Sequence, residues 1–141
     1  MKTLKAMIMG MALLLICGAS QAKSLIGNDN SKDKAIDTYL NAVVHGKLAG
    51  IDDAIDNDAY FGMKRGNTEN TLTKAQILDA LKANENVEQD CQCTKTVVRD
   101  DDDMKVIKVD MKYNDFTRTD VITAEPSGSN WKITKVETSF K

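Results

Sequence analysis

The sequence predicts an α+β domain: a curved antiparallel four-stranded sheet wrapped around a long N-terminal helix, with two further helices and a short hairpin, giving a cone. Two observations lead to this prediction. Apolar residues recur at helical spacing only in the first two thirds of the chain, and the remainder consists of four strand-like runs separated by turn signals. Segregated helices and strands are typical of α+β folds, in which helices cover one face of an antiparallel sheet.

Residues 1–22 have the pattern of a secretory signal peptide. Two lysines precede an apolar run at residues 7–19, and Ala22 completes a small-residue cleavage motif. The run is shorter than the ~20 residues that a membrane-spanning helix needs. Because Ile16 rather than a small residue precedes Cys17, we expect no lipid anchor. The mature protein is therefore expected to be secreted or periplasmic, with no attachment to a membrane after cleavage.

After cleavage, residues 23–30 are expected to form a flexible leader and residues 31–141 one domain. Removing the signal peptide takes two lysines from the 19 basic residues and none of the 21 acidic ones. The net charge then falls from −2 to about −4. An acidic domain with scattered lysines lacks the basic patch of a nucleic-acid-binding protein, so we expect no nucleic-acid partner.

The first helix is predicted to begin at Asn30 or Ser31, which can cap it, and to end at Gly46. One apolar stripe at helical spacing marks its buried face, formed by Ile36, Tyr39, Leu40, Val43 and Val44. A second helix of about two turns is predicted at residues 48–55.

The third helix, at residues 74–84, has the strongest local signal in the chain. Thr73 is a good N-cap, and Gln76 three residues later completes a capping box. Between the second and third helices, residues 59–67 combine two aromatic residues with turn-forming glycines. This composition favours a short strand or hairpin.

Four strands are predicted at residues 91–99, 104–113, 116–125 and 130–140. The second run has one buried face, formed by Ile107, Val109, Met111 and Tyr113. In the last run the apolar phase slips near residues 134–135, which predicts a bulge. The outer face of the sheet is expected to carry the residues out of phase with the core, which include Val106, Lys108, Lys132, Thr134 and Val136.

Two segments resemble the nuclear transport factor 2-like superfamily, also called cystatin-like α+β. They are the helix–turn–helix "AIDTYLNAVVHGKLAGIDDAI" and the final strand "NWKITKVETSF". The resemblance covers residues 31–141 and is greatest to small secreted bacterial proteins described as lumazine-binding or SnoaL-like. It implies a cone-shaped fold. The superfamily includes isomerases, dehydratases, polyketide cyclases, ligand-binding modules and dimerisation domains, so the resemblance implies fold more strongly than function.

The resemblance to steroid isomerases of this superfamily matches Tyr39 to a tyrosine on their first helix. Their aspartate base then falls near Met63, which cannot accept a proton. Asp56 and Asp58 are nearby but are expected in a solvated turn, whereas a general base must reach the substrate. We expect Tyr39 to pack inside the cone with its hydroxyl at the mouth.

No metal or cofactor is expected. His45 is the only histidine, and its position at a helix C-terminus favours a charge–dipole contact. One histidine and a Cys-x-Cys pair do not supply the four ligands of a structural zinc site. The four aspartates at 100–103 lack the spacing of a calcium loop and are interpreted as a hairpin tip.

Cys91 and Cys93 are two residues apart, so on a strand their Cα atoms are about 6.5–7 Å apart. That separation is the upper limit of disulfide geometry. A strained local disulfide, two free thiols, and an intermolecular bridge or metal contact all remain open.

Phe116, Arg118 and Asp120 share one face of the third strand run. If they point into the cone, they provide polar lining for a ligand. If they point outward, Arg118 and Asp120 form a solvated ion pair. We favour the outward orientation, because charged residues on a strand usually mark its wet face.

The sequence as a whole predicts a secreted, non-catalytic ligand-binding or protein-interaction domain of unknown specificity. The expected partners are a small apolar or aromatic ligand and a second copy of the chain, paired through the sheet. The alternative is a small-molecule isomerase or cyclase that uses Tyr39 and an aspartate. The candidate pocket residues are Tyr39, Phe61, Met63, Tyr113, Phe116, Arg118, Asp120 and Trp131.

Overall fold

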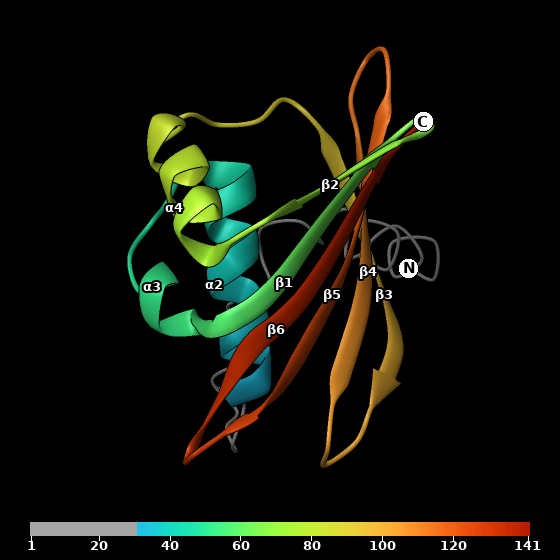
Figure 1. Ribbon diagram of the computed structural model, residues 1–141. Helices are drawn as coiled ribbons and strands as arrows, with labels where there is room; N and C mark the ends of the chain where they lie inside the picture. The colour runs from blue at the N-terminus through green and yellow to red at the C-terminus, as the bar shows by residue number, and fades with distance from the viewer. Residues whose placement is uncertain (1–30) are drawn as a thin grey trace, which may run out of the picture.

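The computed structural model describes residues 31–141, and the expected signal peptide and leader lie outside the described residues. Three helices pack on one side of a six-stranded sheet (Figure 1). The helices are α2 (Ser31–His45), α3 (Ile51–Ala54) and α4 (Lys74–Ala83). The strands are β1 (Ile55–Arg65), β2 (Thr68–Leu72), β3 (Gln92–Asp100), β4 (Lys105–Lys112), β5 (Thr117–Ser127) and β6 (Asn130–Phe140). The predicted α+β class is confirmed.

The strand order is β2-β1-β6-β5-β4-β3, and every neighbouring pair is antiparallel except β1 and β6. The predicted four-strand meander corresponds to β3–β6, but the count of four is wrong for the whole sheet. The short hairpin expected at 59–67 is two full strands that extend the sheet by parallel pairing of β1 with β6. The second helix is correspondingly shorter than 48–55, because the chain enters β1 at Ile55.

The core lies between α2 and the concave face of the curved sheet (Figure 1). α2 buries a stripe that includes Ile36, Tyr39 and Leu40, as its periodicity predicts. The sheet contributes Val109 and Met111 from β4, among others. Burying a large apolar side chain stabilises the fold by ~1.5–3 kcal/mol, so this interface holds helix and sheet together.

The bulge predicted near residues 134–135 is present. Lys135 pairs with Thr123 and Ile133 pairs with Ala124, so Thr134 is the extra residue on β6. The bulge shifts the alternation by one, and Val136 consequently faces the core with 1 % of its surface exposed. The expectation that Val136 lies on the outer face is therefore wrong.

α4 begins with the predicted capping box. The Thr73 hydroxyl accepts a hydrogen bond from the Gln76 backbone N–H at 3.2 Å, and the Gln76 side-chain oxygen accepts one from the Thr73 N–H at 2.9 Å. No residue of α4 is fully buried, and its three large apolar side chains, Ile77, Leu78 and Leu81, are only half-buried against the core. The capping box at Thr73 therefore determines where α4 begins, although α4 buries little of its surface against the core.

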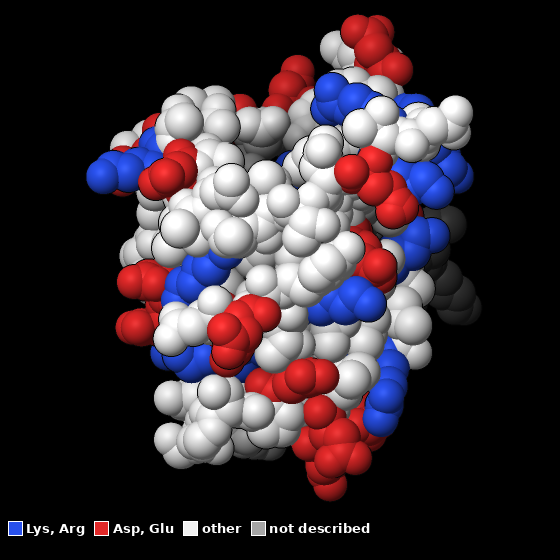
Figure 2. Space-filling model, in the orientation of Figure 1, with Lys and Arg blue, Asp and Glu red and all other residues white. Residues whose placement is uncertain are grey.

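The four aspartates at 100–103 lie at the hairpin tip, as expected: Asp100 ends β3, and the other three form the turn to β4. The Asp101 carboxylate accepts hydrogen bonds from the next two backbone N–H groups in the turn. Figure 2 shows acidic side chains gathered at this end of the molecule. Lys32 and Lys105 both pair with Asp100, and these contacts attach the turn to the start of α2.

Candidate functional site

A buried polar cluster lies on the concave face of the sheet, where β5 and β6 meet α2. Asp120 of β5 is 0 % exposed. One of its carboxylate oxygens accepts hydrogen bonds from Arg118 Nε at 2.9 Å and from Thr138 Oγ1 of β6 at 2.8 Å. The other accepts one from Arg118 Nη2 at 2.9 Å. The carboxylate is thus fully paired by a bidentate arginine and a threonine hydroxyl.

The surroundings of the cluster shift the pKa values of Arg118 and Tyr39. Burial alone would lower the pKa of Arg118, but the charges of Asp120 and Tyr39 and the hydrogen bonds to Asp120 together outweigh burial and raise it. Burial raises the pKa of Tyr39 strongly, and the charge of Asp120 adds to the effect. The Tyr39 hydroxyl stays protonated at neutral pH and interacts with Arg118. Tyr39 packs inside the cone as expected, but its hydroxyl reaches Arg118 in the interior rather than solvent at the mouth.

The outward orientation favoured for Arg118 and Asp120 is therefore wrong. Charged residues usually mark the wet face of a strand because an unpaired buried charge is costly. Here the cost is offset by the bidentate pair and by Thr138, whose side chain comes from a different strand. Only the register of β5 against β6 places Asp120 opposite Thr138, so no local signal predicts this contact.

Three aromatic rings lie beside the cluster, and we call them the aromatic rim: Tyr113, Phe116 and Phe140. Tyr113 and Phe116 are stacked with ring centroids 4.5 Å apart, and Phe140 is 6.0 Å from Phe116. The Arg65 guanidinium sits 4.4 Å from the centre of the Phe140 ring. Phe116 is 42 % exposed, so part of its ring surface is open to solvent. Arg65 and Phe140 were missed from the sequence, because only strand pairing brings them to this end of the sheet.

Cys91 and Cys93 lie next to the aromatic rim. Their sulfur atoms are 3.8 Å apart, well beyond the ~2.05 Å of a disulfide, so the two residues are not bonded to each other. Burial raises the pKa of the Cys91 thiol, with Tyr113 as a hydrogen-bonding neighbour that opposes the shift. The Tyr113 hydroxyl itself donates a hydrogen bond to Gln89 at 3.0 Å. Gln89 is a further residue that the sequence did not single out.

The other predicted pocket residues divide between the two ends of the sheet. Phe61 of β1 is buried with its ring 6.3 Å from that of Tyr39, and Met63 follows two residues later on the same strand. Trp131, in contrast, is the second residue of β6, and the Lys32 ammonium at the start of α2 lies 5.2 Å from the centre of its ring. Trp131 is therefore not part of this cluster. That the remaining residues line a ligand pocket stays a prediction.

The other candidate acid–base groups are engaged elsewhere. His45 Nδ1 lies 2.5 Å from a carboxylate oxygen of Glu88, which forms an ion pair when the imidazole is protonated. Asp56 accepts a hydrogen bond from the backbone N–H of Asp58 within β1, so both belong to a strand rather than the expected turn. Within residues 31–141, no three His, Cys, Asp or Glu side chains lie close enough together to hold a metal ion. The same residues include no helix long and apolar enough to cross a membrane.

No family model and no curated protein matches the sequence. Solved structures do match. A nuclear transport factor 2-like protein of unknown function from Silicibacter pomeroyi DSS-3 aligns with a TM-score of 0.65, covering 86 % of this chain and 99 % of that one at 11 % identity. The chain has the nuclear transport factor 2-like fold.

Two further structures with this fold are similar. One is a nuclear transport factor 2-like protein of unknown function from Methylobacillus flagellatus KT, with a TM-score of 0.61 and 14 % identity over 79 % of this chain and 90 % of that one. The other is a provisionally assigned ketosteroid isomerase from Parabacteroides distasonis ATCC 8503, with a TM-score of 0.54 and 15 % identity over 81 % and 90 %. At such identities the similarity shows the fold alone. The more specific likeness to lumazine-binding or SnoaL-like proteins stays a prediction.

Proposed function

We propose that this protein is a non-catalytic domain that binds a small aromatic or apolar ligand at the aromatic rim. The observation that carries this proposal is the buried Arg118–Asp120 pair lying beside the half-exposed ring of Phe116. A buried ion pair seldom stabilises a fold more than apolar residues of similar volume. Its place beside an exposed aromatic ring is better explained by recognition, with the ring providing a stacking surface.

Binding is favoured over catalysis by the way the cluster is paired. Both oxygens of Asp120 already accept hydrogen bonds, so taking a proton from a substrate would break the ion pair with Arg118. A general base must also lie within hydrogen-bond reach of the substrate, whereas Asp120 is 0 % exposed. The Tyr39 hydroxyl is a donor enclosed in the interior. These features support a rigid, preorganised binding site.

An isomerase remains the second candidate. The observation that favours it is the proximity of a protonated tyrosine, Tyr39, to a buried aspartate, Asp120. In that case the two groups would stabilise a developing oxyanion or move a proton on a small carbonyl compound. The similar structure from Parabacteroides distasonis makes a β,γ-unsaturated ketosteroid the first substrate to assay.

Fluorescence titration with an anilinonaphthalene sulfonate, a flat aromatic probe, tests the binding proposal. Phe116→Ala should weaken the affinity about 2- to 10-fold, because one aromatic contact contributes ~0.5–1.5 kcal/mol. Val97→Ala is the matched control, since Val97 is also an exposed apolar side chain but lies on β3 outside the aromatic rim. Equal affinities in the two variants would count against the site.

The isomerase alternative has its own test. Wild-type protein and Tyr39→Phe are incubated with the β,γ-unsaturated ketosteroid, and formation of the conjugated product is followed by absorbance. Turnover by the wild type that falls at least 10-fold in Tyr39→Phe would replace the binding proposal by the enzymatic one. Absence of turnover in both proteins, together with probe binding that depends on Phe116, supports a binding domain.

We also propose that the protein is secreted or periplasmic. The support is the signal-peptide pattern of residues 1–22. The intact mass of the exported protein should correspond to a chain that begins near Lys23 and carries no lipid. A diacylglycerol mass on Cys17 would contradict this.

We propose further that two copies pair through the outer face of the sheet. Although Val136 faces the core, the outer face still presents Val106 and Thr134, which are partly exposed. Val106→Glu should convert a dimer into a folded monomer, with light scattering giving the mass and circular dichroism the fold. A variant that remains dimeric would exclude this part of the sheet from the interface.

A further inference from the structure

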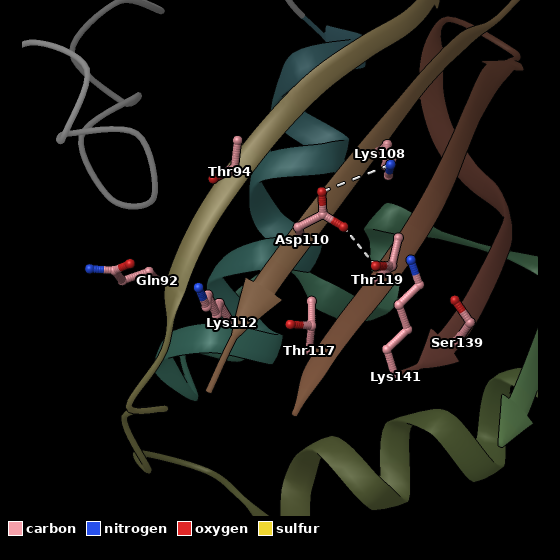
Figure 3. A pocket seen from close by; sticks show the side chains of 9 residues that line it. All are labelled: Gln92, Thr94, Lys108, Asp110, Lys112, Thr117, Thr119, Ser139 and Lys141. Atoms are coloured by element: carbon pink, nitrogen blue, oxygen red, sulfur yellow. Dashed lines mark hydrogen bonds and ion pairs between the residues drawn. The ribbon is translucent and has the colours of Figure 1, made fainter. Parts of the chain in front are cut away.

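The outer face of the sheet carries a polar hollow of its own, on the side opposite the helices (Figure 3). Its volume is about 560 Å³. All the lining residues are polar, and they come from four neighbouring strands and the chain just after β6: Gln92, Thr94, Lys108, Asp110, Lys112, Thr117, Thr119, Ser139 and Lys141. Most small-molecule pockets are predominantly apolar, so an occupant of this hollow must be strongly hydrophilic.

Strand register arranges these side chains in two rows across the sheet. One row carries a carboxylate and three hydroxyls, from Thr94, Asp110, Thr119 and Ser139. The other contains Gln92, Lys112, Thr117 and Lys141, and the Lys141 side chain extends from it toward Thr119 of the first row (Figure 3). Because neighbouring strands lie ~4.8 Å apart, each row spans roughly 14 Å. The hollow therefore matches a small ligand that has an anionic end and several hydroxyl groups.

The charges in the hollow are unevenly compensated. Asp110 lies 4.0 Å from the Lys108 ammonium and accepts a hydrogen bond from the Thr119 hydroxyl at 2.6 Å. Within residues 31–141, neither the Lys112 nor the Lys141 ammonium lies within 4.0 Å of an Asp or Glu side-chain oxygen. The two ammonium groups of the second row therefore have no acidic side chain as a partner, although the domain as a whole is acidic.

We propose that this hollow binds a phosphorylated polyol of the sugar-phosphate class. The phosphate lies over the Thr117 hydroxyl, which Figure 3 shows between Lys112 and Lys141. Lysine ammonium groups bind phosphate as flexible point charges, and the threonine hydroxyl donates one more hydrogen bond. The polyol hydroxyls lie along the other row, where Asp110 accepts and Thr119 and Ser139 both donate and accept.

A second copy of the chain is the competing occupant of this face. Depending on the direction of the two-fold axis, pairing centred on the hollow would set Lys112 and Lys141 of one protomer against the same lysines of the other or against its Asp110. Like charges facing each other across an interface cost several kcal/mol. Arrangements that set lysine against lysine are therefore disfavoured, and the oligomeric state of the chain tests the others.

The test uses the purified chain with three probes at constant ionic strength: glucose 6-phosphate, inorganic phosphate and glucose. Calorimetry should show that glucose 6-phosphate binds at least 10-fold more tightly than either of the others. Lys112→Ala and Lys141→Ala should each weaken its binding at least 5-fold. Lys82→Ala, at an exposed lysine on α4, is the matched control and should leave the affinity unchanged. Circular dichroism verifies that every variant is folded.

Two results would overturn the proposal. One is an affinity for glucose 6-phosphate that is the same in Lys112→Ala, Lys141→Ala and Lys82→Ala. The other is a wild-type dimer that becomes monomeric in Lys112→Glu while none of the three probes binds, because the face then belongs to a second copy. Conversely, Thr117→Val should weaken the binding of glucose 6-phosphate. If it does so without changing the oligomeric state, the result supports the placement of the phosphate.

Discussion

Removing the arginine from the buried ion pair should destabilise the fold more than almost any other single change at this site. In Arg118→Met the aliphatic volume is largely kept, but Asp120 loses two of its three hydrogen-bond donors while it remains 0 % exposed. Hydrogen bonds to a charged group contribute ~1.5–3 kcal/mol each, so two of them amount to about 3–6 kcal/mol. Buried ion pairs that lose one partner typically cost about 3–5 kcal/mol. The two magnitudes agree, and we expect the free energy of unfolding to fall by about 4 kcal/mol.

Urea unfolding followed by circular dichroism, with linear extrapolation to water, measures this loss. A double variant provides the control. In Arg118→Met with Asp120→Leu both charges are gone, and the remaining cost is the buried Thr138 hydroxyl that has lost its acceptor, about 1–3 kcal/mol. The double variant should therefore be more stable than Arg118→Met alone. A loss below about 1 kcal/mol in the single variant would show that Asp120 is solvated and that the cluster is misjudged.

Three further outcomes are expected. Val136→Glu should unfold the chain, because it places a carboxylate in the core. Circular dichroism measures this, and a folded variant would show that Val136 lies on the outer face. Burial raises the pKa of Cys91, so its alkylation by iodoacetamide should reach half its maximal rate at a higher pH than in the unfolded chain, and a lower midpoint would contradict the burial. Thr73→Ala should cost about 1 kcal/mol in urea unfolding, whereas Thr71→Ala, at an exposed strand position, should cost little.

Local chemistry accounts for what the sequence predicts well. The Thr73–Gln76 capping box places the start of α4 to the residue, because its hydrogen bonds join groups only three residues apart. The alternation of apolar and polar residues in β4, and the shift of that alternation in β6, can likewise be recognised within a single segment of the sequence. Each of these signals depends on neighbours in the chain and not on what packs against them.

Long-range pairing accounts for what the sequence did not predict. β1 joins the sheet by parallel pairing with β6, and the paired residues, such as Phe61 and Val136, are 75 to 78 positions apart in the chain. The burial of Asp120 depends on its hydrogen bonds with Thr138 and Arg118. The burial of Val136 depends on the position of the β6 bulge relative to β5. Charge and apolarity alone assigned Asp120 and Val136 to the wrong faces, because the partners that decide their orientation lie on other strands.

The position of β6 in the sheet has a consequence for the order in which the molecule can be assembled. β2 and β1 on one side and β5, β4 and β3 on the other are joined only through β6. Among the described strands β6 is also the last to leave the ribosome, so the two halves of the sheet cannot meet until it has been synthesised. Contacts this distant in sequence also slow folding. The hairpins of β3, β4 and β5 can pair while the chain is being made, but the complete sheet should form only after β6 has been synthesised.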